Sequence, residues 1–395
     1  MSLSQTVKPP TGEVARRRKW DVIVIGCGIM GASVSYNLAR RGLRVLTLEK
    51  YGVNNRFGSS HGETRIIRLA YYEDPRYVPL LRRAYESWRE AEKNSGKKLL
   101  MVTGGLMIGR PEGELLTGVM KSARAYNIPH EVLSSFEAEK RFEAFTLGES
   151  MSAVYEGTAG ILLAEECVRA FVGMASEEGC DFRFSEEVTR VRPGKEGVEV
   201  ETNTGIQAAD RLVLCGGAWN GALVGGALPL TCERQVPLWF PSGGLARFTP
   251  QRMPIFIMEE EQGVFYYGIP DVGHGVKVAR SHGGELSDPD KVRREVTESD
   301  VAPVREFIAR RLNKLQGPPT DSMTCIYSNT PDLNFAVGRF GGDQRITLVS
   351  ACSGHGFKFG SVMGEIAADL ATDKRPEFDI SFLSPDRFTT SGTKR

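Results

Sequence analysis

The chain has 395 residues, of which 41% are hydrophobic and 25% are charged, and its formal net charge at pH 7 is +1. The near-neutral charge excludes a simple electrostatic attraction to nucleic acid or to an anionic membrane. The sequence holds no apolar run long enough to span a bilayer as a helix. A globular chain of this length is expected to divide into two domains with separate cores.

The cysteines and histidines limit the chemistry further. The seven cysteines are scattered without a CxxC pair, and the five histidines are equally dispersed. This pattern favours a reducing compartment, expected to be the cytoplasm, and supports neither a disulfide framework nor a metal site. Residues 1–18 are polar and are expected to form a disordered tail. Basic residues at 16–19 precede an apolar run of only strand length that enters a glycine turn, so export is not predicted.

The stretch from Val22 to Glu49 predicts a strand, a glycine turn, a helix and a second strand. In the turn, Gly26 allows the tight bend, Gly28 allows backbone to approach a pyrophosphate, and Gly31 lets the helix pack against the strand. The helix N-terminus then offers free N–H groups to phosphate oxygens. The stretch therefore predicts a dinucleotide site.

Glu49 follows the last glycine at about the 20-residue spacing that is typical of an acid on a ribose hydroxyl. An acid at this position argues against a cofactor with a 2′-phosphate. The motif alone does not distinguish FAD from NAD.

A polar loop between Tyr51 and Glu63 delivers Arg65 and Arg68 just after the second strand of the motif. The two arginines would share one side if this turn were helical. Two interpretations stay open: a solvated helix start with surface ion pairs, or a contact with a carboxylate or phosphate group.

A second domain, formed by residues 91–147 and 228–317, is predicted to interrupt the nucleotide domain. The nucleotide domain would then consist of three segments, 19–90, 148–227 and 318–395. A buried strand at 211–215, followed by small residues at 216–218 and by Trp219, returns the chain to it. In the second domain, strands are predicted at 235–240, 245–249, 255–258, 263–270 and 275–279. This succession predicts a mostly antiparallel sheet that forms one wall of a substrate cavity.

Three polar positions in this sheet have plain structural interpretations. Lys277 lies in an apolar strand, and the pattern favours an edge strand that points the lysine at water. Tyr266 and Tyr267 point to opposite faces of their strand, so at most one of them faces a site. His282, on the following loop, is typical of a surface residue.

The C-terminal segment places a small-residue loop between a buried strand at 346–351 and a helix that begins near Gly360. Such a loop suits an anion or the edge of a flavin ring. His355 and Lys358 lie in this loop and are predicted to face a ligand. Cys325 lies in a strand-like run, and by itself such a cysteine is typically a buried core residue.

Four blocks of sequence together resemble the monomeric sarcosine oxidase family of flavoprotein amine oxidases, a group that includes N-methyltryptophan oxidase and pipecolate oxidase. The resemblance extends from about Lys19 to Arg387. The blocks are Gly26-Cys27-Gly28-Ile29-Met30-Gly31, Ser60-His61-Gly62-Glu63-Thr64-Arg65-Ile66-Ile67-Arg68, Cys325-Ile326-Tyr327-Ser328-Asn329-Thr330-Pro331-Asp332 and Ser353-Gly354-His355-Gly356-Phe357-Lys358.

The resemblance implies an α/β protein with a doubly wound FAD-binding domain of the glutathione-reductase type. The inserted substrate domain would be α+β and built on the mostly antiparallel sheet. It also implies FAD attached covalently through the sulfur of Cys325 to the 8α position of the flavin. The residues placed at the cofactor are Gly26, Gly28, Ile29, Met30, Gly31, Glu49, Lys50, Ser59, Arg65, Val188, Gly217, Trp219, Cys325, Gly354, Gly356, Phe357 and Lys358.

The activity implied by the resemblance is the oxidation of a secondary amino acid. Arg68 and Lys358 would hold the substrate carboxylate. A hydride equivalent would pass from the carbon next to nitrogen to flavin N5, the imine would be hydrolysed, and O2 would become H2O2. Lys277 would activate oxygen, since a fixed positive charge stabilises developing superoxide. The residues placed around the flavin or the substrate are Arg65, Tyr267, His282, Tyr327 and His355.

Two alternative functions are a flavin dehydrogenase that passes electrons to a partner acceptor and a non-enzymatic flavin-binding subunit. Lys277 argues against the first, and the combined set of cationic residues argues against the second.

The strand around Lys277 matches the family with one residue fewer before the lysine and one more after it, so the identity of the amine stays open. The expected partners are a small secondary amino acid and O2, and the expected state is a monomer.

Overall fold

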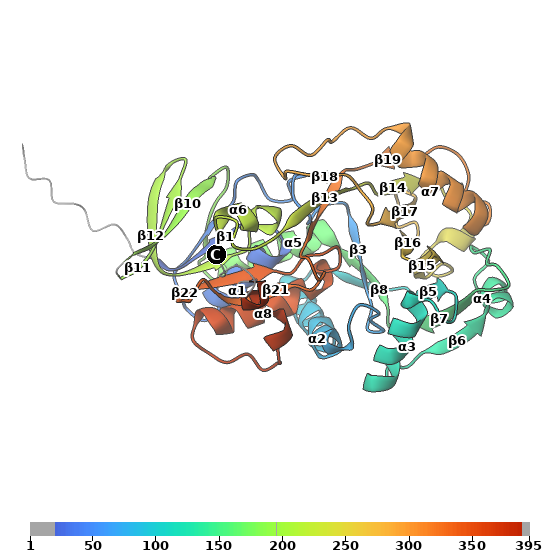
Figure 1. Ribbon diagram of the computed structural model, residues 1–395, viewed down its shortest axis with the longest axis horizontal. Coiled ribbons are helices and arrows are strands. Elements are labelled where there is room, and N and C mark those ends of the chain that lie inside the picture. The colour runs from blue at the N-terminus through green and yellow to red at the C-terminus, as the bar shows by residue number, and fades with distance from the viewer. Residues whose placement is uncertain (1–19, 195, 389–395) are drawn as a thin grey trace, which may run out of the picture.

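The computed structural model describes residues 20–194 and 196–388, so the predicted tail at 1–18 lies outside the described residues. Two large sheets lie beside one another along the long axis of the molecule (Figure 1). Two small sheets connect them. Within the described ranges, no helix combines the length and the apolar character needed to cross a membrane.

The first sheet is organised around β1 (Trp20–Ile25), which pairs in parallel with β2 (Val45–Leu48) and β12 (Gly205–Leu214). β9 (Asp181–Arg183) extends the sheet beyond β2, and β22 (Asp343–Ser350) pairs in parallel with β12. β1 is buried at almost every position, as expected for a parallel strand covered on both faces. This arrangement confirms the predicted doubly wound sheet.

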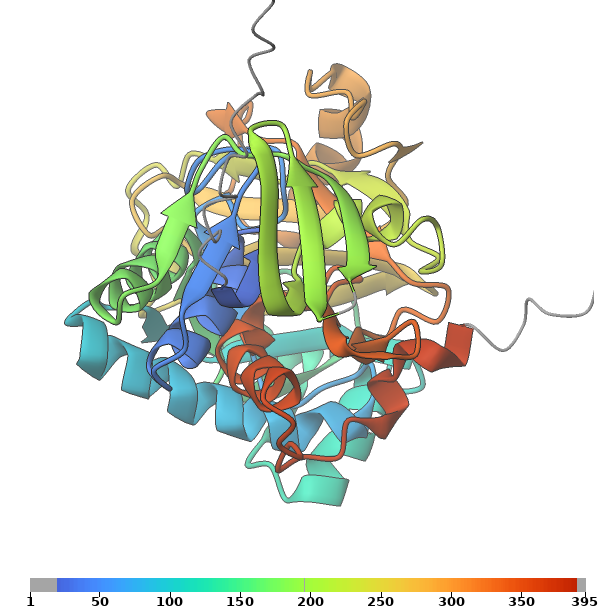
Figure 2. The same cartoon turned by 90° about the vertical axis from the view of Figure 1, so that its left-hand side faces the viewer.

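Three further strands of this sheet are antiparallel. β10 (Val188–Gly194) and β11 (Gly197–Thr202) form a hairpin that continues into β12, as Figure 2 shows in front view. β21 (Ala336–Phe340) pairs with β22. The sequence suggested separate strands at 205–209 and 211–215. The structure joins them in one strand, because β12 pairs first with β11 and then with β1 and β22.

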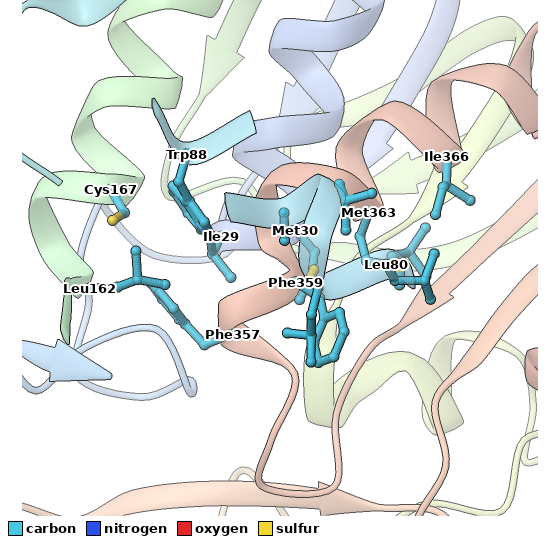
Figure 3. Close-up of a cluster of buried hydrophobic side chains, with 14 of the residues drawn as sticks. Ile29, Met30, Leu80, Trp88, Leu162, Cys167, Phe357, Phe359, Met363 and Ile366 are labelled. Carbon is cyan, nitrogen blue, oxygen red and sulfur yellow. The ribbon is translucent and has the colours of Figure 1, made fainter. Parts of the chain in front are cut away.

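Four helices pack together beside this sheet: α1 (Ile29–Ala39), α2 (Val78–Ser95), α5 (Ala164–Glu177) and α8 (Gly360–Ala371). α1 and α8 approach closely, since a Cβ added to Gly364 would lie 2.0 Å from Ser33 Oγ. Trp88 of α2 is fully buried in the resulting cluster (Figure 3). Its indole Nε1 donates to the Lys358 carbonyl oxygen at 2.8 Å, so this core also fixes the loop before α8.

The second sheet is mostly antiparallel, as predicted, with one parallel pair between β15 and β5. α3 (Glu114–Tyr126), α4 (Ser135–Arg141) and α7 (Glu298–Arg311) accompany it (Figure 1). In spatial order its strands are β19 (Asp321–Ser322), β14 (Leu238–Phe240), β17 (Val276–Ser281), β16 (Val264–Ile269), β15 (Ile255–Glu261), β5 (Gly105–Gly109), β7 (Ser152–Glu156) and β6 (Glu131–Ser134).

Two details of this half differ from the sequence prediction. β7 lies in the range 148–227, which was grouped with the nucleotide domain, yet it pairs with β5 and β6. Residues 245–249 were predicted as a strand, but Ala246–Phe248 forms a 3₁₀ turn instead. The pairing of β7 depends on partners distant in the chain, which the local pattern does not reveal. The turn is closed locally, by the Phe248 N–H on the Leu245 carbonyl oxygen and the Thr249 N–H on the Ala246 carbonyl oxygen.

The two small sheets connect the large ones. One contains β18 (Leu286–Ser287), β13 (Thr231–Gln235) and β20 (Cys325–Asn329), and the other contains β3 (Thr64–Ile67), β8 (Gly160–Leu163) and β4 (Leu100–Val102). The remaining short elements are α6 (Asn220–Leu223) and 3₁₀ turns at Pro75–Tyr77, Gly217–Trp219, Phe357–Phe359, Ser381–Leu383 and Pro385–Phe388.

Candidate active site

A cavity of about 810 Å³ extends from the glycine turn after β1 to the second sheet. Segments from both large sheets and both small sheets line it. Of the residues predicted at the cofactor or the substrate, all line this cavity except Gly31.

The geometry of the glycine turn explains why Gly31 lies behind the cavity wall. A Cβ on Gly31 would lie 1.8 Å from the Gly26 carbonyl oxygen, so this glycine allows the helix to pack on the turn. Gly26 has φ 93°, and a Cβ there would lie 2.5 Å from the Cys215 carbonyl oxygen. Gly28 faces Ser60 Oγ, which also accepts a hydrogen bond from the Ile29 N–H at 3.1 Å. The turn thus leaves a cradle of backbone at the N-terminus of α1, where Met30 also lines the cavity.

Glu49 is a buried carboxylate beside this turn. Its Oε2 accepts from the Cys27 N–H at 2.7 Å, and its Oε1 accepts from the Tyr51 N–H at 2.9 Å. Burial raises the pKa of Glu49, and the two backbone donors offset part of that rise. The carboxylate is therefore oriented by backbone and faces the cavity.

The same end of the cavity is closed by a cluster around Lys50. Its Nζ contacts Asp290 at 2.8 Å and Glu187 at 2.9 Å, and Trp219 Nε1 donates to the same Asp290 at 2.9 Å. The neighbouring Val188 and Gly217 complete this part of the wall. The sequence pattern did not single out Asp290 and Glu187 as partners of Lys50, because both lie more than a hundred residues from it in the chain.

Arg65 and Arg68 differ in their surroundings, because the segment is the strand β3 and not a helix. Arg65 donates through Nη2 to the carbonyl oxygens of Ser59 and His61, and the same nitrogen lies 3.7 Å from Cys325 Sγ. The Ser59 hydroxyl donates to the Ile326 carbonyl oxygen at 2.8 Å. Arg65 therefore ties the loop after β2 to the start of β20.

Arg68 is fully buried and pairs with Glu73. Its Nη2 donates to both carboxylate oxygens, at 2.8 and 2.7 Å, and Nη1 donates to the Ala70 carbonyl oxygen. Its Nε has no hydrogen-bond partner within the described part of the chain. The rings of Tyr71 and Tyr72 lie 4.5 and 5.0 Å from the guanidinium carbon. The solvated-surface interpretation of Arg68 is wrong, and sequence reasoning did not find Glu73.

Lys358 and His355 lie in the loop before α8, in contact with Tyr71. Lys358 Nζ donates to the His355 carbonyl oxygen at 2.7 Å and lies 5.3 Å from the Tyr71 ring centre. Burial, with the nearby charge of Arg68, lowers the pKa of Lys358 to about 7. His355 Nε2 donates to the Leu333 carbonyl oxygen, so its Nδ1 accepts from the Tyr71 hydroxyl at 2.5 Å. Burial lowers the pKa of His355 to about 4, which keeps the ring neutral.

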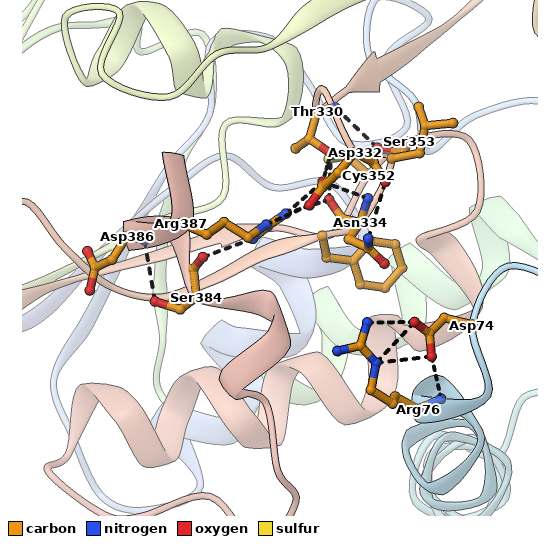
Figure 4. Close-up of polar contacts among 12 residues, drawn as sticks. Asp74, Arg76, Thr330, Asp332, Asn334, Cys352, Ser353, Ser384, Asp386 and Arg387 are labelled. Atoms are coloured by element: carbon orange, nitrogen blue, oxygen red, sulfur yellow. Dashed lines mark hydrogen bonds and ion pairs between the residues drawn. The ribbon is translucent and has the colours of Figure 1, made fainter. Parts of the chain in front are cut away.

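A polar network holds this loop against the end of β20 (Figure 4). The Thr330 N–H donates to Ser353 Oγ at 3.3 Å, and the Asn334 N–H donates to Asp332 Oδ1. Arg387 then pairs with Asp332 at 2.8 Å. These bonds fix the segment that carries Cys325 to the segment that carries Lys358. Gly354, Gly356 and Phe357 belong to the second segment and line the cavity.

Lys277 is buried, with only 2% of its surface exposed. β17 lies between β14 and β16, so the interpretation as an exposed edge strand is wrong. The ammonium donates to the carbonyl oxygens of Gly62 and Thr64 at 2.7 and 2.9 Å, and it lies 3.3 Å from Thr64 Oγ1. Burial, with the nearby charge of Arg65, lowers the pKa of Lys277 to about 7.

Tyr266 and Tyr267 point to opposite faces, as predicted. Tyr266 stacks on Phe307 with ring centres 4.1 Å apart, whereas Tyr267 lines the cavity, where burial raises its pKa to about 12. His282 also lines the cavity and packs edge-on against Tyr327, with ring centres 5.1 Å apart.

The fold and the cavity together define a dinucleotide-binding enzyme with cationic residues at the far end of its site. A model of the family described as FAD dependent oxidoreductase matches residues 21–370. The chain therefore belongs to this family and is an FAD-dependent oxidoreductase. The glycine cradle, the oriented Glu49 carboxylate and the long cavity fit this cofactor.

Individual relatives agree with this assignment. The chain is 39% identical to the monomeric sarcosine oxidase of Streptomyces avermitilis, over 94% of this chain and 98% of that protein. It is 34% identical to the N-methyl-L-tryptophan oxidase of Yersinia pestis, over 93% and 99% of the two chains. These identities confirm the predicted resemblance. The solved structure of NikD, an unusual amino acid oxidase essential for nikkomycin biosynthesis, has the same fold, with a TM-score of 0.82, 23% identity and coverage of 93% and 97%.

Proposed function

We propose that this protein is a flavoprotein oxidase that converts the C–N single bond of a secondary amino acid to an imine, with O2 reduced to H2O2. The two curated relatives named above act, by their names, on sarcosine and on N-methyl-L-tryptophan. The observation that carries the proposal is the pair of buried cations, Arg68 and Lys358, that line one cavity and both contact the Tyr71 ring.

These two cations bind the substrate carboxylate. Arg68 supplies a planar set of donors and Lys358 a point charge, and two charged contacts orient an amino acid as well as hold it. Orientation matters because the carbon–hydrogen bond next to nitrogen must face the cofactor. FAD, when bound, accepts two electrons from the substrate and passes them to O2.

The residues that hold FAD are proposed from the same cavity. Backbone of the glycine turn at Gly28 and the N-terminus of α1 take the pyrophosphate, with the Ile29 N–H exchanging its bond to Ser60 Oγ for a phosphate oxygen, and Glu49 takes a ribose hydroxyl. Cys325 carries the covalent bond to the flavin. Arg65 supports this role, because its Nη2 lies 3.7 Å from the sulfur and so fixes the start of β20 beside the cavity.

Lys277, in its protonated form, is proposed to assist the reaction with O2 by placing a positive charge beside the cavity. His355 is proposed as a neutral hydrogen-bonding residue that positions Tyr71 and Lys358. Tyr267, Tyr327 and His282 shape the wall that faces the substrate.

We also propose that the segments paired in the first sheet form the FAD domain and those paired in the second form the substrate domain, with β7 in the latter. The protein is expected to act as a monomer in the cytoplasm. All seven cysteines lie in the described residues and are free.

The proposal is tested by measuring peroxide release from a panel of sarcosine, larger N-methylated amino acids, L-proline and L-pipecolate. At least one of them should give stoichiometric peroxide, and the Lys358→Met variant should raise KM for that substrate. No peroxide from any member would refute the proposal. Rapid re-oxidation of the reduced enzyme in air separates an oxidase from a dehydrogenase, which would re-oxidise slowly without its partner.

A further inference from the structure

Glu233 is a buried carboxylate in β13, on the face of the small sheet that borders the cavity. It stands opposite Tyr327 in the antiparallel register of β13 and β20, and Gln235 stands opposite Cys325. Since side chains alternate along a strand, Glu233, Gln235, Cys325 and Tyr327 project from one face of this sheet. Arg234, on the other face, pairs with Asp300 near the start of α7. The register thus places Glu233 directly beside Gln235, Cys325 and Tyr327, which line the cavity.

The carboxylate of Glu233 is fully engaged. Its Oε1 accepts from Gln235 Nε2 and from the Gly284 N–H, both at 2.9 Å. Its Oε2 accepts from Asn329 Nδ2 at 2.6 Å and contacts His282 Nδ1 at 3.1 Å. Burial raises the pKa of Glu233, but the hydrogen bonds from His282 and Gly284 hold it below its usual value, so the group is ionised.

The loop that carries His282 is fastened to this carboxylate. His282 has φ 62°, a left-handed conformation that is unfavourable for a residue with a side chain, so contacts must hold it there. A Cβ on Gly284 would lie 1.8 Å from the Arg234 carbonyl oxygen, so the loop lies directly on β13. The ring of His282 then packs against Tyr327.

These contacts determine which nitrogen of the His282 imidazole carries a proton. An ionised carboxylate only accepts hydrogen bonds, so Nδ1 of His282 must carry the proton. In this tautomer the ring lone pair lies on Nε2, which has no hydrogen-bond partner within the described part of the chain. The side chain lines the cavity and is 33% exposed, so a proton taken up there can leave to solvent.

We infer that Glu233 is a positioning residue for the proposed oxidation. It holds His282 so that the ring nitrogen Nε2 accepts the proton that a secondary ammonium substrate loses before its C–N bond is oxidised. The inference rests on the proposed function. In this step the substrate N–H bond breaks, an Nε2–H bond forms, and the positive charge moves from the amine to the imidazole. The freed nitrogen lone pair is what allows the neighbouring carbon to lose a hydride equivalent, and no oxidation state changes in the transfer.

The first test compares Glu233→Gln with the wild type in anaerobic stopped-flow reduction of the flavin. The limiting reduction rate at saturating substrate should fall by about 10- to 100-fold, since positioned proton transfer contributes about 10²–10⁴-fold and Gln retains part of the contact. The dissociation constant of a carboxylate inhibitor without an amine should change less than about two-fold.

The matched control is Glu285→Gln, which alters a carboxylate of the same loop that pairs with Arg293 and not with His282. The flavin of this variant should be reduced at the wild-type rate. A Glu233→Gln rate within two-fold of wild type overturns the inference.

A second variant covers the case in which Glu233→Gln does not fold. His282→Ala should show the same loss of reduction rate, and added imidazole should restore part of it. A loss that imidazole does not restore overturns the proton-acceptor role. If the wild-type flavin is not reduced by any secondary amino acid, the proposed function itself fails, and this outcome is distinct from both of the others.

A spectroscopic test needs no turnover. In protein labelled with ¹⁵N-histidine, the His282 signals, assigned by their loss in His282→Gln, should show the Nδ1-protonated tautomer. In Glu233→Gln this preference should disappear. An Nε2-protonated ring in the wild type contradicts the inference.

Discussion

Glu73 occupies the position in front of Arg68 that a substrate carboxylate is proposed to take. Its two oxygens accept from the same Nη2, at 2.8 and 2.7 Å, and both side chains are largely buried. The charge of Arg68 opposes the effect of burial and holds the pKa of Glu73 below its usual value, so the pair is ionic. A substrate carboxylate must therefore compete with Glu73 for the guanidinium.

Glu73→Gln should strengthen the binding of a carboxylate inhibitor. The amide keeps one acceptor for Arg68 but removes the competing negative charge. We expect the dissociation constant to fall by about three- to ten-fold, which corresponds to about 0.7–1.4 kcal/mol. Titration of the flavin spectrum measures it. Asp74→Asn is the matched control, because this neighbouring acid pairs with exposed Arg76 and leaves Arg68 untouched. Equal or weaker inhibitor binding by Glu73→Gln would show that Glu73 does not compete with the inhibitor carboxylate for Arg68.

Binding of the same inhibitor should depend on pH through Lys358. Because its pKa is lowered to about 7, the side chain is charged below pH 7 and neutral above it. A carboxylate favours the charged form, so binding takes up a proton and the dissociation constant should rise by up to about ten-fold per pH unit above pH 7. Lys358→Arg stays charged and should give a nearly flat profile between pH 6 and 9. If the dissociation constant depends on pH in the same way in the wild type and in Lys358→Arg, Lys358 does not contribute to carboxylate binding.

The sequence predicted those parts of the site whose residues lie close together in the chain. The stretch from Gly26 to Glu49 contains its own strand, turn and acid, so spacing alone indicated a nucleotide site, and the structure brings Glu49 to 2.7 Å from the Cys27 N–H. The loop from Ser353 to Lys358 was found in the same way, from small residues between a strand and a helix.

The parts that were missed depend on pairing between distant segments. The strand pattern alone favoured an edge position for Lys277, because nothing in its own strand indicates that β14 and β16 flank it; only the family resemblance placed the lysine at the site. The role of Glu233 depends on the register of β13 with β20 and on a loop 49 residues away. Long-range register is set by tertiary packing and turn geometry, which a local pattern does not contain.

Cys325→Ser should release the flavin. In the wild type, acid precipitation should leave the yellow colour in the pellet, whereas the variant should lose it to the supernatant. Cys352→Ser is the control, because Cys352 also lines the cavity but its sulfur contacts Ser350 and Ser353. That variant should retain its flavin. Wild-type flavin that washes free would show that the attachment is not covalent.

Lys277→Met should slow re-oxidation by O2 by at least about 100-fold, because a positive charge in a partly dry site contributes several kcal/mol to a step that develops negative charge. Reduction by substrate should change far less. The same change removes one of two donors from each of the carbonyl oxygens of Gly62 and Thr64, which keep the Thr64 N–H and Arg65 Nη1, so the unfolding free energy should fall by about 0.5–1.5 kcal/mol per lost hydrogen bond. Stopped-flow measurement of each half-reaction and a urea titration separate the two effects. Lys291→Met, which removes an exposed lysine that pairs with Asp288 and does not line the cavity, should leave re-oxidation unchanged. Equal slowing of both half-reactions in Lys277→Met would assign the lysine a structural role alone.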